Sequence, residues 1–301
     1  MASLEYTERP ELHRSILIAA FAGWPDASEG ATRAVRHVAR QLSARKFASI
    51  DGEEFYDLTE HRPIVSIDGD GARSISWPSN DFYAWSSGDE SKRDLLLLSG
   101  LEPHYRWRAF TSLITEVAEL CDVQLVVTLG ALLDAVPHTR PITVTASATT
   151  HDLGEGLEDL RLEPSAYQGP TGIMSILLDV MDQRGIPCAS LWGHAPHYVQ
   201  AKPNPNVARA LLTALEPFLP APIDTRRMER RGAEFTRRLT RALEDQGEIT
   251  RYVAQLEERY DAEKDSAGTP VESGDAEPLI AELEEFLRRE NSGGEEGGPG
   301  V

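Results

Sequence analysis

The sequence predicts an α/β protein with a mostly parallel central sheet flanked by helices. Several short runs are almost entirely apolar, as expected of strands that are buried on both faces. Amphipathic stretches at helical spacing separate these runs, and this alternation is typical of βαβ units. The chain has 301 residues, of which 41% are hydrophobic, so it is long enough to bury a sizeable core.

The first predicted strand covers residues 15–23 and is followed by Trp24 and Pro25. Asp26 is expected to cap the next helix, and Glu29 to return the hydrogen bond, as in a capping box. Apolar residues then recur at helical spacing, and they are Ala31, Ala34, Val35, Val38, Ala39 and Leu42. The chain therefore opens with a strand, a tight loop and a helix.

Residues 61–85 have a different pattern, which predicts a β-hairpin. Apolar and polar residues alternate weakly over 63–68, and residues 73–78 can form the returning strand. Between them, Asp68-Gly69-Asp70-Gly71 has the composition of a tight turn.

The rest of the α/β region continues the alternation of apolar runs and amphipathic stretches. Strands are predicted over residues 94–100, 123–130, 141–147 and 187–193, and helices over 107–120, 172–184 and 206–218. The rigid stretch 203–206 precedes the last of these helices, and either Asn204 or Asn206 is expected to cap it.

The composition changes after residue 222. Residues 223–264 are charged and helical, and Gly247 is expected to divide them into a helical hairpin. The apolar residues near heptad a and d positions are Phe235, Leu239, Ala242, Ile249, Val253, Leu256 and Tyr260. The predicted organisation is an α/β core over 1–222, this extension, and a flexible acidic tail over 265–301 with a possible short helix at 279–289.

Charge and cysteine content exclude several classes of function. The net charge is −19, which argues against binding to nucleic acid or to an anionic membrane surface. Residues 262–301 hold 11 acids and 3 bases, or 3 − 11 = −8 of that total. Cys121 and Cys188 lie in or beside apolar runs without a CxxC motif, so we expect buried free thiols. No apolar run near the start is long enough to span a bilayer, and we expect a cytoplasmic protein.

Side chains able to bind or react gather in the loops that follow the predicted strands. Ligands of open parallel sheets bind beyond the carboxyl ends of the strands. The candidates in loops 23–26, 99–104, 130–134 and 193–198 are Trp24, Asp26, Glu102, His104, Gly130, His194, His197 and Tyr198. A further loop precedes the helix at 172–184 and adds Gly169, Thr171 and Gly172. Thr171 is the expected N-cap there, at a helix end that could hold an anion.

Each candidate also has a purely structural interpretation. Asp26 can be only a helix cap, and Trp24 and Tyr198 can simply close the core. Glu102 and His104 can be a polar loop or a general acid/base pair. Pro196 excludes a regular helix that would pair His194 with His197, so no metal site is predicted there. The chain has no P-loop, G-x-G-x-x-G or G-x-S-x-G motif, and we expect no cofactor.

Four segments carry a family resemblance, and they are Gly23-Trp-Pro-Asp-Ala-Ser, Tyr167-Gln-Gly-Pro-Thr-Gly-Ile, Ser190-Leu-Trp-Gly-His-Ala-Pro-His-Tyr-Val and Pro203-Asn-Pro. In order and spacing they resemble the proteasome assembly chaperone 2 family over about residues 15–220, and the extension at 224–264 resembles that of its actinobacterial branch. The resemblance implies a phosphorylase/hydrolase-like α/β fold, as in nucleoside phosphorylases. Eukaryotic relatives are heterodimeric chaperones that dock on the proteasome α-ring through a C-terminal hydrophobic–Tyr–any tail. This chain ends with Gly298-Pro-Gly-Val301 and has no tyrosine over 262–301, which speaks against that docking mode.

Two functions follow as hypotheses. The first is a protein-interaction or assembly-chaperone role, with a protein partner that can be proteasome-related and with self-association, for which a trimer is our guess. The second is a small-molecule binding protein, for nucleosides or anions, or a hydrolase/phosphorylase-like enzyme that uses the loops at the carboxyl edge. The family supplies no catalytic residue, and the sequence leaves enzymatic activity open while favouring a binding role.

Overall fold

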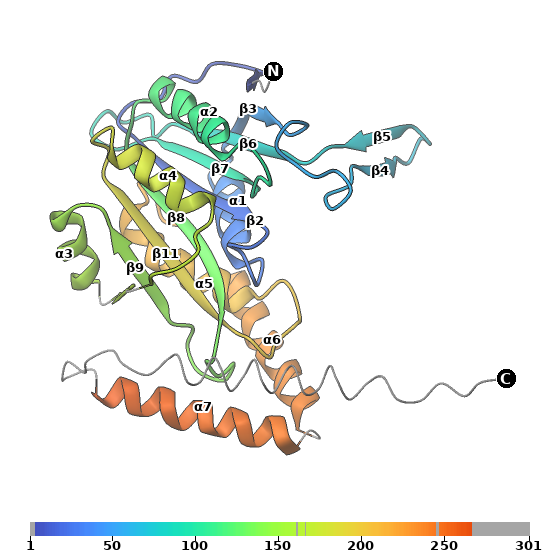
Figure 1. Cartoon of the computed structure of the whole chain (residues 1–301), viewed down its shortest axis with the longest axis vertical. Coiled ribbons are helices and arrows are strands. Elements are labelled where there is room, and N and C mark those ends of the chain that lie inside the picture. Colours follow the sequence, from blue (N-terminus) through green and yellow to red (C-terminus); the bar gives the residue numbers. More distant parts are fainter. Residues whose placement is uncertain (1–3, 161, 166, 245–246, 267–301) are drawn as a thin grey trace. The chain divides into compact units, whose positions relative to one another are not determined.

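A nine-stranded mixed sheet forms the centre of the fold in the part of the chain that the structure describes (Figure 1). The structure is a computed structural model and describes residues 4–160, 162–165, 167–244 and 247–266. The chain divides into two units, Met1–Glu258 and Arg259–Val301, and the sheet lies in the first. Its strands are β1 (Leu4–Tyr6), β2 (Ser15–Ala22), β3 (Arg45–Asp51), β6 (Ser79–Trp85), β7 (Leu95–Leu101), β8 (Val123–Asp134), β9 (Val144–Ala148), β10 (Glu163–Pro164) and β11 (Cys188–Pro196).

The centre of the sheet is parallel, which confirms the predicted fold class. The strand order is β1-β3-β6-β7-β2-β8-β11-β9-β10. Strand β2 pairs in parallel with β7 and β8, and β8 pairs in parallel with β11. Strands β3, β6 and β9 join the sheet through antiparallel ladders. The strand predicted at 141–147 is therefore present as β9, three residues later at its start and antiparallel to β11.

Two strands extend further than the sequence predicts. Strands β8 and β11 remain paired up to the partners Asp134 and Pro196. The segments 130–134 and 193–196, which were predicted as loops, are therefore strand. Backbone pairing explains the difference, because each strand satisfies the other's N–H and C=O groups after the neighbouring β2 has ended.

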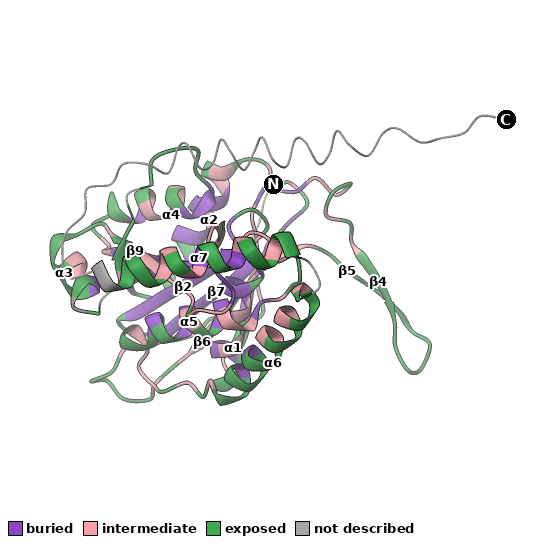
Figure 2. Ribbon diagram, turned by 90° about the horizontal axis from the view of Figure 1, so that it is seen from below, coloured by how far each residue is buried: buried purple, intermediate pink, exposed green. Residues whose placement is uncertain are grey.

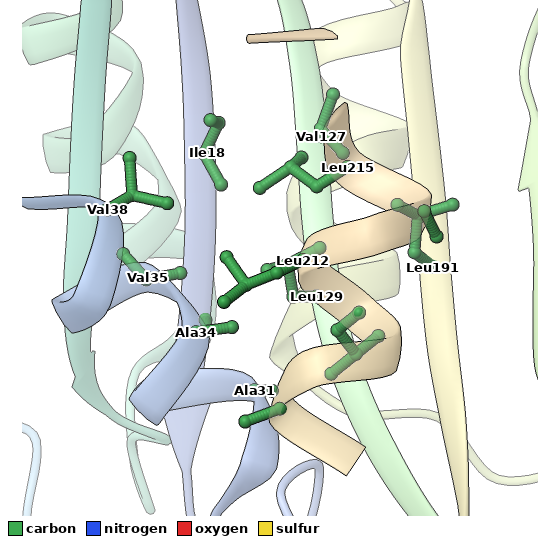
Figure 3. Packing of buried hydrophobic residues seen from close by; sticks show 14 of the residues in the cluster. Ile18, Ala31, Ala34, Val35, Val38, Val127, Leu129, Leu191, Leu212 and Leu215 are labelled. Atoms are coloured by element: carbon green, nitrogen blue, oxygen red, sulfur yellow. The ribbon is translucent and has the colours of Figure 1, made fainter. Parts of the chain in front are cut away.

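Helices cover both faces of the parallel strands. Helices α1 (Gly30–Gln41) and α5 (Pro205–Leu215) pack on one face, and Figure 3 shows α1 side chains such as Val35 against Ile18 of β2. Helices α2 (Trp107–Leu120) and α4 (Ile173–Asp182) pack on the other face. The predicted helix at 206–218 is split, since α5 ends at Leu215 and a 3₁₀ turn, η1 (Glu216–Phe218), follows. Asn204 caps α5 by accepting the backbone N–H of Asn206 at 3.0 Å, as expected for one of the two asparagines.

The predicted hairpin is present as a separate two-stranded sheet, β4 (Ile64–Ile67) and β5 (Arg73–Ser76). It extends away from the nine-stranded sheet (Figure 1), and every residue of both strands is exposed (Figure 2). Asp68 closes the turn, because its side chain accepts the backbone N–H groups of Asp70 and Ala72. Strand alternation places Val65, Ile67 and Ile75 on one face and serines on most of the other.

Two charged helices follow the α/β region, α6 (Arg226–Leu243) and α7 (Gly247–Ser266). Met228 of α6 belongs to the core cluster of α1 and α5. Among the predicted heptad residues, Val253 and Leu256 are buried. Helix α7 continues through residues 265 and 266, which were predicted as the start of the flexible tail. From residue 267 on, that tail, including the helix predicted at 279–289, lies outside the described residues.

Both cysteines are buried and free, as predicted. Burial raises the pKa of each thiol to about 12, so both stay protonated near neutral pH. In the described part of the chain, no helix combines the length and the hydrophobicity needed to cross a lipid bilayer.

Candidate functional site

The candidate loops meet at one edge of the sheet because the strands β2, β7, β8 and β11 are parallel. Backbone hydrogen bonds tie the first loop to the end of β8. The N–H of Ala27 donates to the carbonyl of Ala131 at 2.9 Å, and the N–H of Ala131 donates to the carbonyl of Pro25 at 2.8 Å. The N–H of Glu102 likewise donates to the carbonyl of Ala22 at 2.9 Å. The edge is therefore a fixed platform rather than a set of independent loops.

Asp26 is buried and caps α1 from outside the helix. One carboxylate oxygen accepts the N–H of Ala31 at 2.9 Å, and the other accepts the N–H and the hydroxyl of Thr32 at 3.0 and 2.6 Å. Burial raises the pKa of Asp26, although these hydrogen bonds oppose the increase. The capping interpretation is confirmed, but the capping box is wrong. Glu29 occupies the N-cap position with a left-handed backbone and makes no side-chain cap.

Glu102 caps the other helix that begins at this edge. Its Oε1 accepts the N–H of Ile173, the first residue of α4, at 2.9 Å. The prediction that Thr171 is the N-cap is wrong, because Gly172 holds that position and has no side chain to offer. The end of α4 that could have held an external anion thus receives the chain's own carboxylate. Burial raises the pKa of Glu102, and the Ile173 N–H opposes that increase.

Trp24 stands over this cap with its ring largely in solvent. The residue is 62% exposed, so the interpretation that it closes the core is wrong. A Cβ atom at Gly172 would lie 2.6 Å from Glu102 Oε1 and 3.4 Å from the Trp24 ring. A side chain at position 172 would therefore push the Glu102 carboxylate away from the helix end.

Gly169 has a local role next to this cap. A Cβ atom there would lie 2.6 Å from the hydroxyl of Tyr167, which donates to the carbonyl of Pro170 at 2.8 Å. Tyr167 is exposed, as are Trp24 and Tyr105 in the edge loops and Leu133 near the end of β8.

Gly130 makes room for an aromatic ring of the neighbouring strand on one face of the sheet. It faces Trp192 across the β8–β11 ladder, and a Cβ atom at Gly130 would lie 2.6 Å from that ring. The indole N–H of Trp192 donates to Ser190 Oγ at 2.9 Å, and Thr128 donates to the same oxygen at 3.0 Å. Gly130 therefore shapes the core beneath the edge.

His104 does not pair with Glu102 as an acid/base couple. Its Nε2 lies 3.1 Å from Glu60 Oε2, and its Nδ1 accepts the N–H of Asp57 at 3.3 Å. Glu102 is committed to Ile173 instead. The two residues leave the same loop, but they belong to different clusters.

His194 links three strands in a hydrogen-bonded series that the sequence does not reveal. Its Nδ1 lies 2.7 Å from Asp134 Oδ2 on β8, and its Nε2 lies 3.0 Å from Thr145 Oγ1 on β9. A carboxylate can only accept, so the neutral ring carries its proton on Nδ1 and Nε2 accepts the Thr145 hydroxyl. The pairing of β9 with β11 brings Thr145 here. The strand predicted at 141–147 contains Thr145, and this prediction was the signal in the sequence that could have found it.

His197 and Tyr198 face the C-terminal helices rather than solvent. His197 Nδ1 lies 2.9 Å from the carbonyl oxygen of Asp134, and its Nε2 lies 3.4 Å from the Tyr252 hydroxyl of α7. His197 and His194 thus contact different atoms of Asp134 and do not share a ligand position.

The Tyr198 hydroxyl bonds to His138, a residue that no motif in the sequence marks as a candidate. It accepts the N–H of His138 and lies 2.8 Å from His138 Nδ1. His138 Nε2 lies 3.2 Å from Thr240 Oγ1 of α6. Burial raises the pKa of Tyr198 to about 12 and lowers that of His138, so both are neutral near pH 7. This corner of the edge is a packing contact.

Fold and site together define an α/β protein whose carboxyl-edge loops are hydrogen-bonded to the ends of the strands and carry exposed aromatic side chains. The chain belongs to the PAC2 family, whose model matches residues 20–243. This result confirms the resemblance to proteasome assembly chaperones in the sequence. Comparison with functionally curated proteins gives no significant match.

Similar solved structures agree with this assignment. A PAC2 family protein from Streptomyces avermitilis is 38% identical, with a TM-score of 0.72, and the match covers 79% of this chain and 99% of that one. A proteasome-assembly chaperone homologue from Mycobacterium tuberculosis is 33% identical over the same shares, with a TM-score of 0.69. An archaeal proteasome activator from Pyrococcus furiosus is 22% identical over 81% of this chain and 99% of that one, with a TM-score of 0.66, and shows the shared fold.

Proposed function

We propose that this chain is an assembly-chaperone-like protein that binds a proteasome-related protein partner through the carboxyl edge of its sheet. Membership of the PAC2 family supports a role of this type, as does the likeness to the protein described as a proteasome-assembly chaperone homologue. The proposal includes self-association, with a trimer as the first oligomer to test, a cytoplasmic location and descent from the actinobacterial branch.

The exposed ring of Trp24 is the observation that carries the proposal. Trp24 follows β2 directly, and its loop is fixed on both sides by the bonds of Ala27, Ala131 and Asp26. Tryptophan is enriched at the energetic centres of protein interfaces, and a preorganised loop loses little entropy on binding. An exposed tryptophan on a rigid platform thus has the properties of an interface anchor.

Trp24→Ala is expected to weaken capture of proteasome subunits strongly while leaving the fold intact. Tagged full-length chain would be incubated with a native lysate that contains proteasomes, and bound proteins would be quantified by mass spectrometry. Removal of a central aromatic anchor costs on the order of 2 kcal/mol or more, so we expect recovery to fall by about tenfold or more. The thermal midpoint should stay unchanged, since the ring is mostly in solvent.

Trp77→Ala is the matched control, because Trp77 is 56% exposed but follows the β4–β5 hairpin. It should recover proteasome subunits like the wild type. The proposal fails if the wild type recovers no proteasome subunit above a tag-only control, or if Trp24→Ala recovers as many as the wild type. Equal losses in both variants would place the interface elsewhere.

The series Asp134–His194–Thr145 supports a second candidate function, a hydrolase acting on small esters. With its proton on Nδ1, His194 can take the Thr145 hydroxyl proton on Nε2 while Oγ1 attacks the ester carbonyl carbon. The C–O bond to the alcohol then breaks, and the alcohol leaves with the proton from Nε2. Water, with Nε2 again as the base, hydrolyses the acyl group from Thr145 and restores the hydroxyl. We rank it second because a threonine hydroxyl is a hindered nucleophile, and because the same bonds also serve to tie three strands together.

Hydrolysis of p-nitrophenyl acetate tests this second function. Both His194→Ala and Thr145→Ala should lower kcat/KM by about 100-fold or more, since each removes a member of a series that acts as a unit. His151→Ala removes an exposed histidine on α3 (His151–Asp159) and should leave the rate unchanged. A wild-type rate equal to that of either site variant would rule the enzyme out.

A further inference from the structure

We propose that Glu60, His61 and His104 form a binding site for one divalent transition-metal ion. One potential ligand atom from each residue lies within 4.8 Å of the other two. Among the described residues, this is the group of His, Cys, Asp or Glu side chains that is close enough together to hold a metal ion. The inference is independent of the proposed protein partner, because it rests on different side chains and on a different kind of ligand.

The ligand atoms are already close to coordination geometry. His104 Nε2 and Glu60 Oε2 are 3.1 Å apart, and the ring centroids of His61 and His104 are 5.0 Å apart. Two ligands of a tetrahedral zinc ion with bonds of about 2.0–2.1 Å are separated by about 3.4 Å. The carboxylate–imidazole pair therefore needs almost no movement, and the ligand atom of His61 already lies within 4.8 Å of the other two.

His61 brings an imidazole nitrogen that is not hydrogen-bonded within the described part of the chain. Its Nδ1 is buried and has no hydrogen-bond partner among the described residues. Leaving a buried polar atom unpaired costs about 1–3 kcal/mol, and such an atom needs an explanation. A metal ion bound by this cluster would give the ring a function, and this function would explain an otherwise unfavourable position.

Backbone hydrogen bonds hold the two ligand-bearing loops in place. The N–H groups of Glu60 and His61 both donate to the carbonyl of Asp57, at 3.1 and 2.9 Å. The N–H of His104 donates to the carbonyl of Phe55 at 2.8 Å. The segment after β3 and the loop after β7 are thus joined, and the three side chains start from fixed positions. Fixed starting positions are what a metal site requires.

The hydrogen bonds of His104 define what the ion must displace. The N–H of Asp57 donates to Nδ1, so the ring proton sits on Nε2 and faces Glu60. A metal on Nε2 takes the place of that proton, and the ring proton passes through solvent to Nδ1. The Asp57 contact must then open. At 3.3 Å it is the longer of the two contacts, and Asp57 lies on the same segment as the other two ligands.

Two imidazoles and one carboxylate select the class of ion. This set suits zinc and other late first-row divalent ions, whereas Mg²⁺ and Ca²⁺ require mainly oxygen ligands. Three protein ligands leave a fourth position open, as in catalytic zinc sites. The side chains of Glu60 and His104 are 65% and 25% exposed, so this open position is accessible to water.

Titration of the full-length chain with Zn²⁺ by calorimetry tests the proposal. The wild type should bind one equivalent, and both Glu60→Gln and His61→Ala should weaken that binding by at least about tenfold. Glu60→Gln keeps the shape of an exposed side chain and should not disturb folding. With Co²⁺ the wild type should show visible absorption bands of a low-coordinate ion, and His61→Ala should lose them.

His151→Ala is the matched control. His151 Nε2 lies 3.2 Å from Glu155 Oε1 on the surface of α3, so this pair offers the same chemistry without a third ligand, and its loss should leave the affinity unchanged. The proposal is overturned if the wild type binds no stoichiometric Zn²⁺, or if Glu60→Gln and His61→Ala bind it as tightly as the wild type. Capture of proteasome subunits is also measured with EDTA, which removes divalent ions. Capture that persists with EDTA supports the proposed function whether or not Zn²⁺ binds, so the two proposals can fail separately.

Discussion

Replacing Asp26 by alanine is expected to lower the free energy of unfolding by about 2–4 kcal/mol. The substitution removes a buried carboxylate that accepts three hydrogen bonds from Ala31 and Thr32. Loss of a helix cap costs about 0.5–2 kcal/mol, and loss of hydrogen bonds to a charged group adds about 1.5–3 kcal/mol. Two backbone N–H groups at the start of α1 would remain buried without a partner. Urea denaturation followed by circular dichroism measures the change.

Asp89→Ala is the control for this prediction. Asp89 accepts the N–H and the hydroxyl of Ser91 at 3.0 and 2.7 Å, the same pattern that Asp26 makes with Thr32, but it is exposed. Water replaces those bonds after the substitution, so the change should stay within about 0.5 kcal/mol. Similar losses for both variants would show that burial of Asp26 contributes little, contrary to our argument.

Replacing Gly130 by alanine is expected to destabilise the fold by about 2–3 kcal/mol. The added methyl group would meet the Trp192 ring at 2.6–2.8 Å, and this half-buried ring, which packs against the core, must move. Such overpacking costs about 1–3 kcal/mol. The movement would also weaken the hydrogen bond from the Trp192 indole N–H to Ser190 Oγ. The shift of the urea midpoint gives the size of the effect.

Gly156→Ala provides the contrasting control, with the opposite sign. Gly156 lies inside α3, is exposed, and has no neighbour within 4 Å of an added Cβ. Alanine favours a helix over glycine by about 0.5–1 kcal/mol, so this variant should be slightly more stable. In the double variant with Trp192→Leu, the penalty of Gly130→Ala should largely disappear. A persistent penalty would mean that contact with the ring is not its cause.

The buried parallel strands were the predictable part of the fold. Strands β2, β7, β8 and β11 are apolar along most of their length because helices cover both of their faces. Strands β3 and β6 went unpredicted for the opposite reason. Each buries only some of its residues, so their sequences lack a continuous apolar run. Helix α3 also escaped prediction, since Gly154 and Gly156 weaken its helical signal.

The location of the candidate site was predictable, but its hydrogen-bond partners were not. Parallel topology alone brings the loops of Trp24, Glu102 and His194 to one edge. The partners of His194, Asp134 and Thr145, depend on the register of β8, β11 and β9. Register follows from tertiary packing that one sequence does not reveal. Glu60 and His138 reach the site from segments with no strong local pattern.

The hairpin of β4 and β5 has a consequence for how this chain can evolve. None of its eight strand residues belongs to either core cluster. Selection for a stable fold therefore hardly acts on Val65, Ile67 or Ile75, and drift should replace such exposed apolar residues with polar ones. If a lineage keeps them, the pressure that preserves them comes from whatever the hairpin touches outside its own chain.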